Sequence, residues 1–370
     1  MTDTLLVLNA GSSSLKFSMF RQGDLGLLAR GQVSRIDGAA TFTAGLTGKP
    51  PETRDMAKGA DHVAALESVL DFIDRHDDSW RIAAVAHRVV HGGSDFTGPI
   101  LVNPQVIQAL AALTPLAPLH QPHNLAAIDA AGRLLPKVAN IACFDTAFHT
   151  TLPELHSTFA LRRELRDKGI WRYGFHGLSY RWIARVLSED HPQLAAGRVV
   201  AAHLGNGASL CAMRGGESLD TTMGLTALDG LTMGTRAGAI DAGAVLYMQR
   251  ALGMSIEDTE DELYRRSGLL GLSGLSNDVE TLLGSDDPRA GFALDHFALR
   301  VAQFSAKMAV SMGGLDGVVF TGGIGEHAAP VREAILARLA FLAPFEVQII
   351  PANEERMMAI EAQAVLSATG

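Results

Sequence analysis

The chain has 370 residues, 47% of them hydrophobic and 19% charged, with a net charge of −9. This length is too great for one compact core and predicts two domains. The acidic balance argues against general binding of nucleic acid or of an anionic membrane, so an anionic substrate would have to meet local positive charge. The chain does not begin like a signal peptide and has no apolar run approaching the ~18 residues that span a bilayer, which predicts a cytoplasmic protein.

The first apolar run of the chain breaks at Asn9 and resumes after one glycine and three serines, in the stretch LVLNAGSSSLKF. This pattern predicts a hairpin of two strands. Asn, Gly and Ser are ordinary turn residues, but backbone amides in such a turn can also face a charged ligand. Taken alone, the stretch leaves both interpretations open.

Two helices are predicted next, each with a recognisable start. Asp61 is a candidate N-cap for an apolar stripe that reaches Ile73, and Asn103 followed by Pro104 begins another helix. Short apolar strands are predicted at 82–85, 138–143, 317–320 and 347–350, and further helices at 292–312, 331–342 and 354–366. Their alternation predicts an α/β fold with mixed sheets covered by helices.

A second hairpin is predicted at 199–213, VVAAHLGNGASLCAM, and its pattern is similar to that of the first. Two similar hairpins, each at the start of a domain, suggest two domains of related topology. We expect the first domain to comprise residues 1–148 with 352–370, so that the last helix returns to it, and the second to comprise 149–351. The two cysteines, Cys143 and Cys211, lie far apart in apolar surroundings and are predicted to be buried free thiols.

Glycine-rich turns follow three of the predicted strands, in NAGSSS, in Gly205-Asn206-Gly207 and in TGGIGE from Thr321 to Glu326. Glycine lets backbone amides approach a ligand closely, and successive amides form a concavity that suits phosphate oxygens. A tight turn explains any one of them, whereas the three together favour phosphate binding. None matches a P-loop or a dinucleotide fingerprint, which points away from Walker-type ATPases and nicotinamide enzymes.

Two arginines stand among small residues, which is an unusual place for a solvated surface charge. Arg88 lies in AHRVVHGG and Arg236 in GTRAG. The planar guanidinium suits carboxylate and phosphate groups. A structural salt bridge would explain either arginine alone, but their shared setting in a chain with phosphate-type turns favours anion binding.

Histidines and acidic residues give weaker signals when each is taken singly. The histidines that stand out are His120, His123, His176 and His203. None has the spacing of a zinc site, and each by itself is more often a core or turn residue. Asp145 at a strand end and Glu354 at a helix start are candidates for a magnesium–nucleotide site, which needs only one or two carboxylates. Glu355 is interpreted as ordinary charge at a helix N-terminus.

Together these motifs resemble the acetate kinase family, in the acetokinase branch of the sugar kinase, Hsp70 and actin fold. The matching stretches, in family order, are LVLNAGSSSLKF, AHRVVHGG, LAPLHQPHN, ACFDTAFH, YGFHGLSYRWI, AHLGNGASLCA, LDTTMGLTALDGLTMGTRAG, FTGGIGEHA and IPANEERMMA. The resemblance implies two related α/β domains of the RNase H-like type with an active-site cleft between them. It also implies reversible in-line transfer of the ATP γ-phosphoryl group to acetate, which gives acetyl phosphate and ADP.

The resemblance implies a role for each matching residue. Arg88 and Arg236 would bind the carboxylate and the transferring phosphoryl group. His176 would hydrogen-bond an equatorial oxygen of that phosphoryl group, and Asp145 would orient these side chains. Asn9 and Glu354 would hold Mg²⁺, for which Mn²⁺ could substitute. The substrate pocket would be lined by Arg88, Val90, Leu119, Phe175 and Ala227. The residues expected along ATP or ADP, mostly in the second domain, are Lys16, His203, Leu204, Gly205, Asn206, Gly207, Asp278, Val279, Glu280, Gly322, Gly323, Ile324, Gly325, Glu326 and His327.

Four departures from the family pattern bear on specificity. Ala227 replaces the usual proline in the acyl pocket, and its smaller side chain suggests a relaxed preference for the length of the acid. Glu280 stands where the family has arginine beside the adenosine, which leaves the phosphoryl donor open. Ala239 and Ala242 replace the usual Asp and Pro, and His327 replaces Asn.

Three other functions remain as alternatives. A propionate kinase on the same fold is the nearest. A non-catalytic nucleotide sensor would have no need of Arg88, His176 and Arg236, and a sugar kinase would need an aspartate base without explaining two arginines. The expected partners are acetate or propionate and a nucleotide, with neither nucleic acid nor membrane, and the resemblance implies a homodimer.

Overall fold

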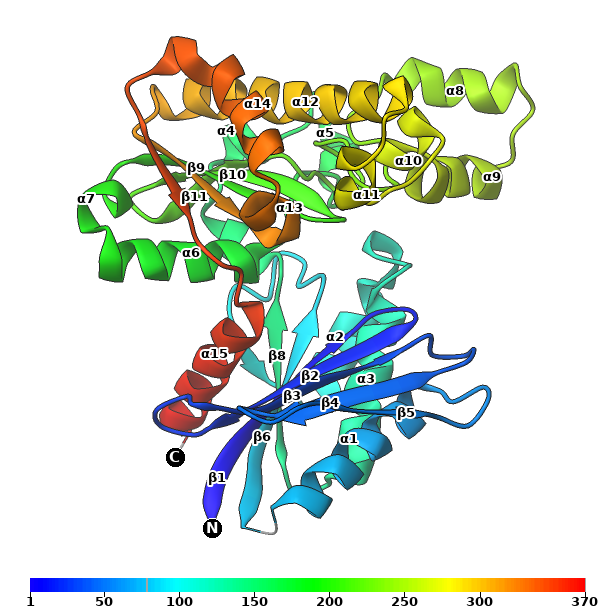
Figure 1. The fold of residues 1–370 in the computed structure, drawn as a ribbon, viewed down its shortest axis with the longest axis vertical. Helices are drawn as coiled ribbons and strands as arrows, with labels where there is room; N and C mark the ends of the chain where they lie inside the picture. Colours follow the sequence, from blue (N-terminus) through cyan, green and yellow to red (C-terminus); the bar gives the residue numbers. More distant parts are fainter. Residues whose placement is uncertain (78, 370) are drawn as a thin grey trace. The chain divides into compact units, whose positions relative to one another are not determined.

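The computed structural model describes residues 1–77 and 79–369, which fold as two compact units (Figure 1). The first unit comprises Met1–Ala147 with Asn353–Gly370, and the second comprises Phe148–Ala352. Each unit contains one β-sheet flanked by helices. Within the described residues, no helix has the length and apolar character needed to cross a membrane.

The described residues of the first unit form eight strands and four α-helices. The strands are β1 (Thr2–Ala10), β2 (Ser14–Arg21), β3 (Leu27–Ser34), β4 (Thr41–Leu46), β5 (Glu52–Asp55), β6 (Trp80–Val89), β7 (Ile100–Leu101) and β8 (Ala139–Phe144). The helices are α1 (His62–His76), α2 (Pro104–Ala112), α3 (Gln121–Leu134) and α15 (Glu354–Thr369), with a 3₁₀ turn η1 (Thr114–Leu116).

The second unit is richer in helix. Its strands are β9 (Arg198–Leu204), β10 (Ala208–Arg214), β11 (Glu217–Thr221), β12 (Gly317–Thr321) and β13 (Glu346–Ile349). Its helices are α4 (Glu154–Ser157), α5 (Arg163–Arg166), α6 (Gly177–Asp190), α7 (Pro192–Ala195), α8 (Ala242–Arg250), α9 (Ile256–Asp261), α10 (Gly268–Ser273), α11 (Val279–Leu283), α12 (Pro288–Met312), α13 (Gly322–His327) and α14 (Ala329–Leu339). Short turns are η2 (Ala147–Thr151), η3 (Glu262–Arg266, a π-helix) and η4 (Ala340–Leu342).

The two sheets repeat one topology. Their strand orders are β5-β4-β3-β2-β1-β6-β8-β7 and β11-β10-β9-β12-β13. In the first sheet β1 pairs antiparallel with β2 and parallel with β6, which pairs parallel with β8. In the second, β9 pairs antiparallel with β10 and parallel with β12, which pairs parallel with β13. The relation between the two predicted hairpins is therefore confirmed, and it extends to five strands of each sheet.

The predicted helix starts are confirmed in atomic detail. The Asp61 side chain accepts a hydrogen bond from the backbone N–H of Ala64 at 2.9 Å and caps α1. Asn103 caps α2 in the same way from Val106, and Pro104 is the first helical residue. Helix α12 begins at Pro288, four residues before the predicted start. The side chain of Asp287 caps the helix there, and proline is favoured at the first helical position.

The core of the first unit lies between its sheet and helices α1 and α3. Three buried aromatic rings, Phe17 of β2, Phe42 of β4 and Phe72 of α1, meet with centroids 5.8–6.4 Å apart. Helix α15 also contacts β1, β6 and β8, and the sulfur of Cys143 lies 4.0 Å from the carbonyl oxygen of Met358. The last helix of the chain thus packs against the first sheet.

The core of the second unit has helices on both faces of its sheet (Figure 1). Tyr180, Ile183 and Leu187 of α6 pack against β9 and β10, and the long helix α12 crosses β9, β10 and β11. Cys143 and Cys211 are both buried free thiols, as predicted.

Candidate active site

Five of the predicted site residues of the first unit come from adjacent elements. They are Asn9 in β1, Lys16 in β2, Arg88 in β6, Asp145 just after β8, and Glu354 at the start of α15. Asn9 and Lys16 are cross-strand partners in the hairpin. Because β1, β6 and β8 run parallel, their carboxyl ends lie at one edge of the sheet, which is where open α/β sheets bind ligands.

Arg88 and Asp145 form the central ion pair of this cluster. The Arg88 Nη2 and Nε atoms donate to Asp145 Oδ2 at 2.6 and 3.0 Å, and Nε also lies 3.2 Å from Oδ1. The Asp145 side chain is 2% exposed and that of Arg88 is 20% exposed. Burial disfavours the charged guanidinium, but the attraction of Asp145 and Glu354 is stronger in total, so the pKa of Arg88 is raised. Asp145 therefore fixes the direction in which Arg88 presents its remaining N–H groups.

Asn9 and Glu354 both approach the free end of Arg88. Arg88 Nη1 donates to Asn9 Oδ1 at 3.4 Å and lies 3.9 Å from Glu354 Oε2. Burial raises the pKa of Glu354, while the positive charges of Arg88 and Lys16 lower it. An amide and a carboxylate oxygen are the hard donors that Mg²⁺ prefers, so the pair fits this ion. Among residues 1–77 and 79–369, no three His, Cys, Asp or Glu side chains form a group that could hold a metal ion.

The predicted acyl-pocket residues of the first unit, Val90 and Leu119, lie close to the same edge. Val90 follows β6 directly, and its N–H donates to Asn124 Oδ1 at 3.0 Å. The Asn124 amide in turn donates to the carbonyl oxygen of Ala10, at the end of β1. Val90 is buried and Leu119, just before α3, is half-buried. Asn124 thus connects the end of β1, before the first glycine-rich turn, to Val90 of the predicted acyl pocket.

In the second unit the structure brings His176, His203, Gly207 and Arg236 together. The rings of His176 and His203 lie 4.4 Å apart between centroids. A Cβ atom built on Gly207 would lie 3.5 Å from His176 Nε2 and 3.9 Å from Arg236 Nη1. The imidazole and the guanidinium therefore face the same point beside the GNG turn, which is an arrangement suited to an anion with several oxygens.

Arg236 is held by the segment that carries Ala227. Its Nη1 donates to the Ala227 carbonyl oxygen at 3.1 Å and lies 3.8 Å from Met233 Sδ. The backbone just before Ala227 is held by Arg172, whose Nη1 donates to the carbonyl oxygens of residues 221, 222 and 223. Phe175 is buried, and its carbonyl oxygen lies 2.9 Å from His149 Nε2. The backbone at Ala227 therefore helps to hold Arg236 in place.

The last glycine-rich turn, Gly322 to His327, opens helix α13 instead of leading directly into the longer helix. Gly322 has φ +79°, and a Cβ there would lie 2.7 Å from the Leu204 carbonyl oxygen, so only glycine fits against the end of β9. Glu326 Oε1 accepts from the N–H groups of Gly322 and Ala352, which gives it a structural role. The hydroxyl of Thr321 is buried without a hydrogen-bond partner among the described residues.

The predicted adenosine-side residues belong to helix α11. Asp278 caps this helix through the N–H and hydroxyl of Thr281, and the side chain of Val279 is buried. Glu280 is exposed. Asn206 lies nearby, since its side-chain oxygen accepts from Asn277 at 3.1 Å. The GNG turn and α11 are therefore neighbours, while the carboxylate of Asp278 is already engaged within the protein.

Comparison with known proteins identifies the family. A family model described as the Acetokinase family matches residues 4–363. The chain belongs to the acetokinase family. An acetate kinase of Rhodopseudomonas palustris (strain TIE-1) is 48% identical over 358 residues, covering 92% of this chain and 87% of the relative. One of Methylocella silvestris is 41% identical over 401 residues, covering 99% and 98%.

Two solved structures of this family resemble the fold closely. A propionate kinase from Francisella tularensis superimposes with a TM-score of 0.91 at 34% identity, over 97% of this chain and 98% of its own. The Porphyromonas gingivalis acetate kinase gives a TM-score of 0.89 at 32% identity, over 98% and 100%. The two-domain fold of the sugar kinase, Hsp70 and actin type is therefore confirmed for this acetokinase.

Sequence reasoning missed residues that hold the predicted ones in this acetokinase. Asn124, Tyr180, Ser209 and Arg172 all lie inside or beside the quoted motifs, yet none was singled out. Position was the available signal for Tyr180, because it stands four residues after His176 and so on the same face of α6. Asn124 and Arg172 act on residues distant in sequence, which only the tertiary structure reveals.

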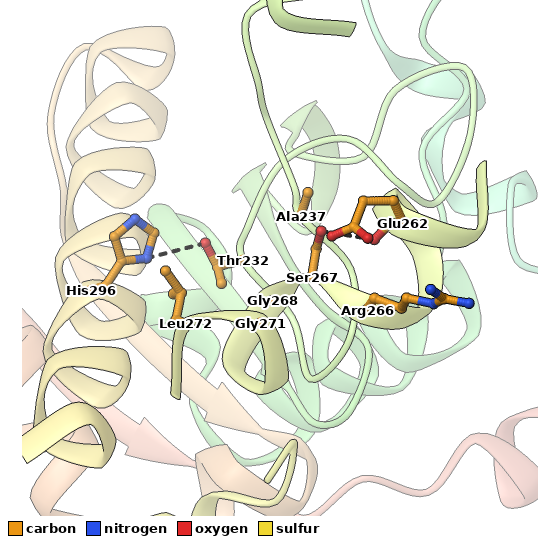
Figure 2. Close-up of a pocket in the computed structure, with 9 residues that line it drawn as sticks. All are labelled: Thr232, Ala237, Glu262, Arg266, Ser267, Gly268, Gly271, Leu272 and His296. Atoms are coloured by element: carbon orange, nitrogen blue, oxygen red, sulfur yellow. Dashed lines mark hydrogen bonds between the residues drawn. The ribbon is translucent and has the colours of Figure 1, made fainter. Parts of the chain in front are cut away.

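A cavity of about 300 Å³ lies in the second unit, beside Ala237 (Figure 2). Thr232 and His296 bond across one side at 3.4 Å, and Ser267 donates to the Glu262 carbonyl oxygen on the other. Its remaining lining residues are Ala237, Arg266, Gly268, Gly271 and Leu272. None of the site residues predicted from the sequence lines this cavity.

Proposed function

We propose that this chain is an acetate kinase, which transfers the γ-phosphoryl group of ATP to acetate reversibly. The observation that carries the proposal is that, in a member of the acetokinase family, the side chains of two predicted anion-binding sets lie together. One is Arg88 with Asp145, and the other is His176 with Arg236. We further propose that the two compact units correspond to the domains expected at 1–148 with 352–370 and at 149–351.

The chemistry needs positioning and charge rather than a base. Acetate is ionised at neutral pH, since its pKa is near that of a carboxyl side chain at ~4, so the nucleophile requires no deprotonation. Arg88, held by Asp145, would bind the acetate carboxylate. Arg236 and His176 would bind the equatorial oxygens of the transferring group, where the loose transition state collects negative charge. No covalent enzyme intermediate is required.

We also propose that the reaction depends on Mg²⁺, with Mn²⁺ as a possible substitute. Asn9 and Glu354 would hold the ion, which would neutralise phosphate charge when bound. Lys16 and the segments 203–207 and 322–327 would follow the ATP or ADP phosphates. Support comes from the oxygen donors of Asn9 and Glu354 beside Arg88, and from the lack of a side chain at Gly207, where a Cβ would approach His176 and Arg236.

The deciding experiment traps the product with hydroxylamine. Purified enzyme is supplied with Mg²⁺, with acids of two to four carbons and with either ATP or pyrophosphate. Hydroxamate from acetate and ATP is expected. Because Glu280 leaves the identity of the phosphoryl donor undecided, GTP is tested beside ATP and pyrophosphate. The absence of hydroxamate from every pair of acid and donor would exclude the kinase function.

Propionate is the second candidate substrate. The Francisella tularensis protein of very similar fold is a propionate kinase, and Ala227 leaves a small side chain in the predicted acyl pocket. One methylene is worth only about 1–3 kcal/mol of discrimination, so a simple pocket would accept both acids. We expect kcat/KM for propionate to stay above about one hundredth of that for acetate, and a lower ratio would contradict a relaxed pocket.

We propose that the protein forms a homodimer through the face around α8. No residue of this helix is buried, and Leu246, Tyr247, Leu252 and Ile256 are 47–72% exposed. Such a group of exposed apolar side chains is typical of an interface. Sedimentation at micromolar concentration should give a dimer for the wild type, and Ile256→Glu should shift it toward monomer. A monomeric wild type would contradict the proposal.

A further inference from the structure

The orientation of His176 is set by two buried hydroxyl groups. His176 stands just before α6 in the left-handed region at φ 58°, and its Nδ1 lies 2.9 Å from Ser209 Oγ of β10. One helical turn later, the Tyr180 hydroxyl lies 2.5 Å from the same oxygen. Ser209 and Tyr180 are both 0% exposed. A chain of two hydrogen bonds therefore runs from the core of the second unit to the imidazole.

The protons of this chain have a preferred direction. A phenol, with a pKa near 10, is a stronger donor than an aliphatic alcohol, so the short bond runs from Tyr180 O–H to Ser209 Oγ. The single proton of Ser209 is then available to His176 Nδ1, and each bond strengthens the next. With Nδ1 accepting, the proton of the neutral imidazole sits on Nε2.

The other edge of the ring is the one that faces Arg236. A Cβ on Gly207 would lie 3.5 Å from Nε2 of His176 and 3.9 Å from Nη1 of Arg236, so both atoms border one point. If an anion occupies that point, an Nε2–H group donates to it, whereas a bare Nε2 lone pair would repel it. The tautomer therefore decides whether His176 supports or opposes the charge that Arg236 attracts.

We propose that Tyr180 and Ser209 are positioning residues that hold His176 as its Nε2–H tautomer, aimed at the phosphoryl oxygens. This inference rests on the proposed function for the identity of the anion. Among the described residues, His203 of β9, Ser209 of β10 and Arg236 lie beside His176, and Tyr180 reaches it through Ser209. Tyr180 and Ser209 would touch no substrate and act only through the histidine.

The tautomer can be measured directly in the unaltered enzyme. In ¹⁵N-labelled protein at a pH where His176 is neutral, Nδ1 should give the resonance of an unprotonated ring nitrogen and Nε2 that of an N–H. The signals are assigned by their loss in His176→Gln. A protonated Nδ1 would overturn the proposal. This readout needs neither substrate nor turnover, so it can fail while the phosphotransferase assay succeeds, and the reverse.

Tyr180→Phe tests the chain of bonds by removing one hydroxyl and keeping the ring. We expect kcat to fall roughly 10- to 100-fold, as for lost outer-shell partners, with KM for both substrates nearly unchanged. The His176 spectrum should shift toward a mixture of tautomers. Tyr173→Phe is the matched control, because its hydroxyl donates to the Gly169 carbonyl at 3.2 Å, and it should keep wild-type turnover and tautomer. Unchanged kcat and spectrum in folded Tyr180→Phe would overturn the proposal.

Discussion

At the scale of single residues, the partner of a charged side chain determines what that side chain can do. Arg88 and Arg21 both form ion pairs at 2.6–2.7 Å, yet Asp145 is buried whereas the side chains of Arg21 and Asp24 are 47% and 60% exposed. An exposed pair of this kind contributes little to stability, and a buried one cannot lose a partner without a large cost. Asp145 thus orients Arg88, and Arg88 in turn neutralises the buried charge of Asp145.

Arg88→Ala is expected to lower kcat by two to three orders of magnitude, about 3–4 kcal/mol, because it removes a preorganised donor from the transition state. Arg236→Ala should have an effect of the same order. Steady-state assays measure both, and circular dichroism checks that each variant is folded. Arg21→Ala is the control and should keep wild-type turnover. A folded Arg88→Ala enzyme with near wild-type turnover would contradict the role given to Arg88.

Two neighbouring glutamates should respond differently to the loss of charge. Glu354 lies 3.9 Å from Arg88 in the predicted magnesium site, whereas Glu355 is interpreted as helix N-terminal charge. Glu354→Gln is expected to raise the Mg²⁺ concentration for half-maximal rate at least about 10-fold, and Glu355→Gln to change it little. Initial rates across a Mg²⁺ titration distinguish them. Equal shifts in both variants would show that only general charge matters.

At the scale of elements, helix α10 supports the segment that carries Arg236. The N–H groups of Leu269 and Leu270 donate to the carbonyl oxygens of Met233 and Gly234. Gly268 has φ +64°, and a Cβ there would lie 2.2 Å from the Met233 carbonyl oxygen and 2.9 Å from the Arg236 nitrogen. The absence of a side chain at this position is what allows the helix to approach so closely.

Gly268→Ala is therefore predicted to displace the Arg236 segment and lower kcat at least about 10-fold, since small misplacement of a catalytic group is costly. Gly253→Ala is a close control: its φ of +70° is equally unfavourable for alanine, but nothing lies within 4 Å of the new Cβ. Both should lose about 1–2 kcal/mol of stability from backbone strain. Equal activity in the two variants would show that the close approach is unimportant.

At the scale of the whole molecule, buried histidines occur in both compact units. Burial lowers the pKa of His87, His91 and His149 to about 4 each. His87 and His91 belong to the first unit, and His149 to the second. Their ordinary pKa is 6.5, so between pH 6.5 and 4 the unfolded chain binds protons that the folded chain excludes. Stability must then fall as the pH is lowered through this range.

We predict a loss of roughly 2 kcal/mol per fully buried histidine on going from pH 7 to pH 5, measured by urea unfolding at both pH values. His149→Gln should reduce by about one the number of protons taken up on unfolding at low pH, and so reduce the slope of the unfolding free energy with pH. An unfolding free energy that is constant between pH 7 and 5 would contradict these pKa shifts.

Much of the fold could be predicted because its signals are local. Asp61, Asn103 and Pro104 mark helix starts through bonds that reach only three residues along the chain. The two hairpins were visible as apolar runs divided by small residues. The helices between Asp241 and Leu283 were not predicted, because three of them, α9, α10 and α11, have only five or six residues and depend on packing against neighbouring segments.

The sequence by itself determined the family, the two hairpins and the residue types of the candidate site, because these depend on motifs and short-range patterns. Only the tertiary structure decided which residues meet. It joined Arg88 to Asp145 across 57 positions and His176 to Ser209 across 33, and it engaged Glu326 and Asp278 within the protein. The reason is physical: hydrogen bonds and ion pairs act over a few ångströms in space, and strand order and burial decide which distant residues come that close.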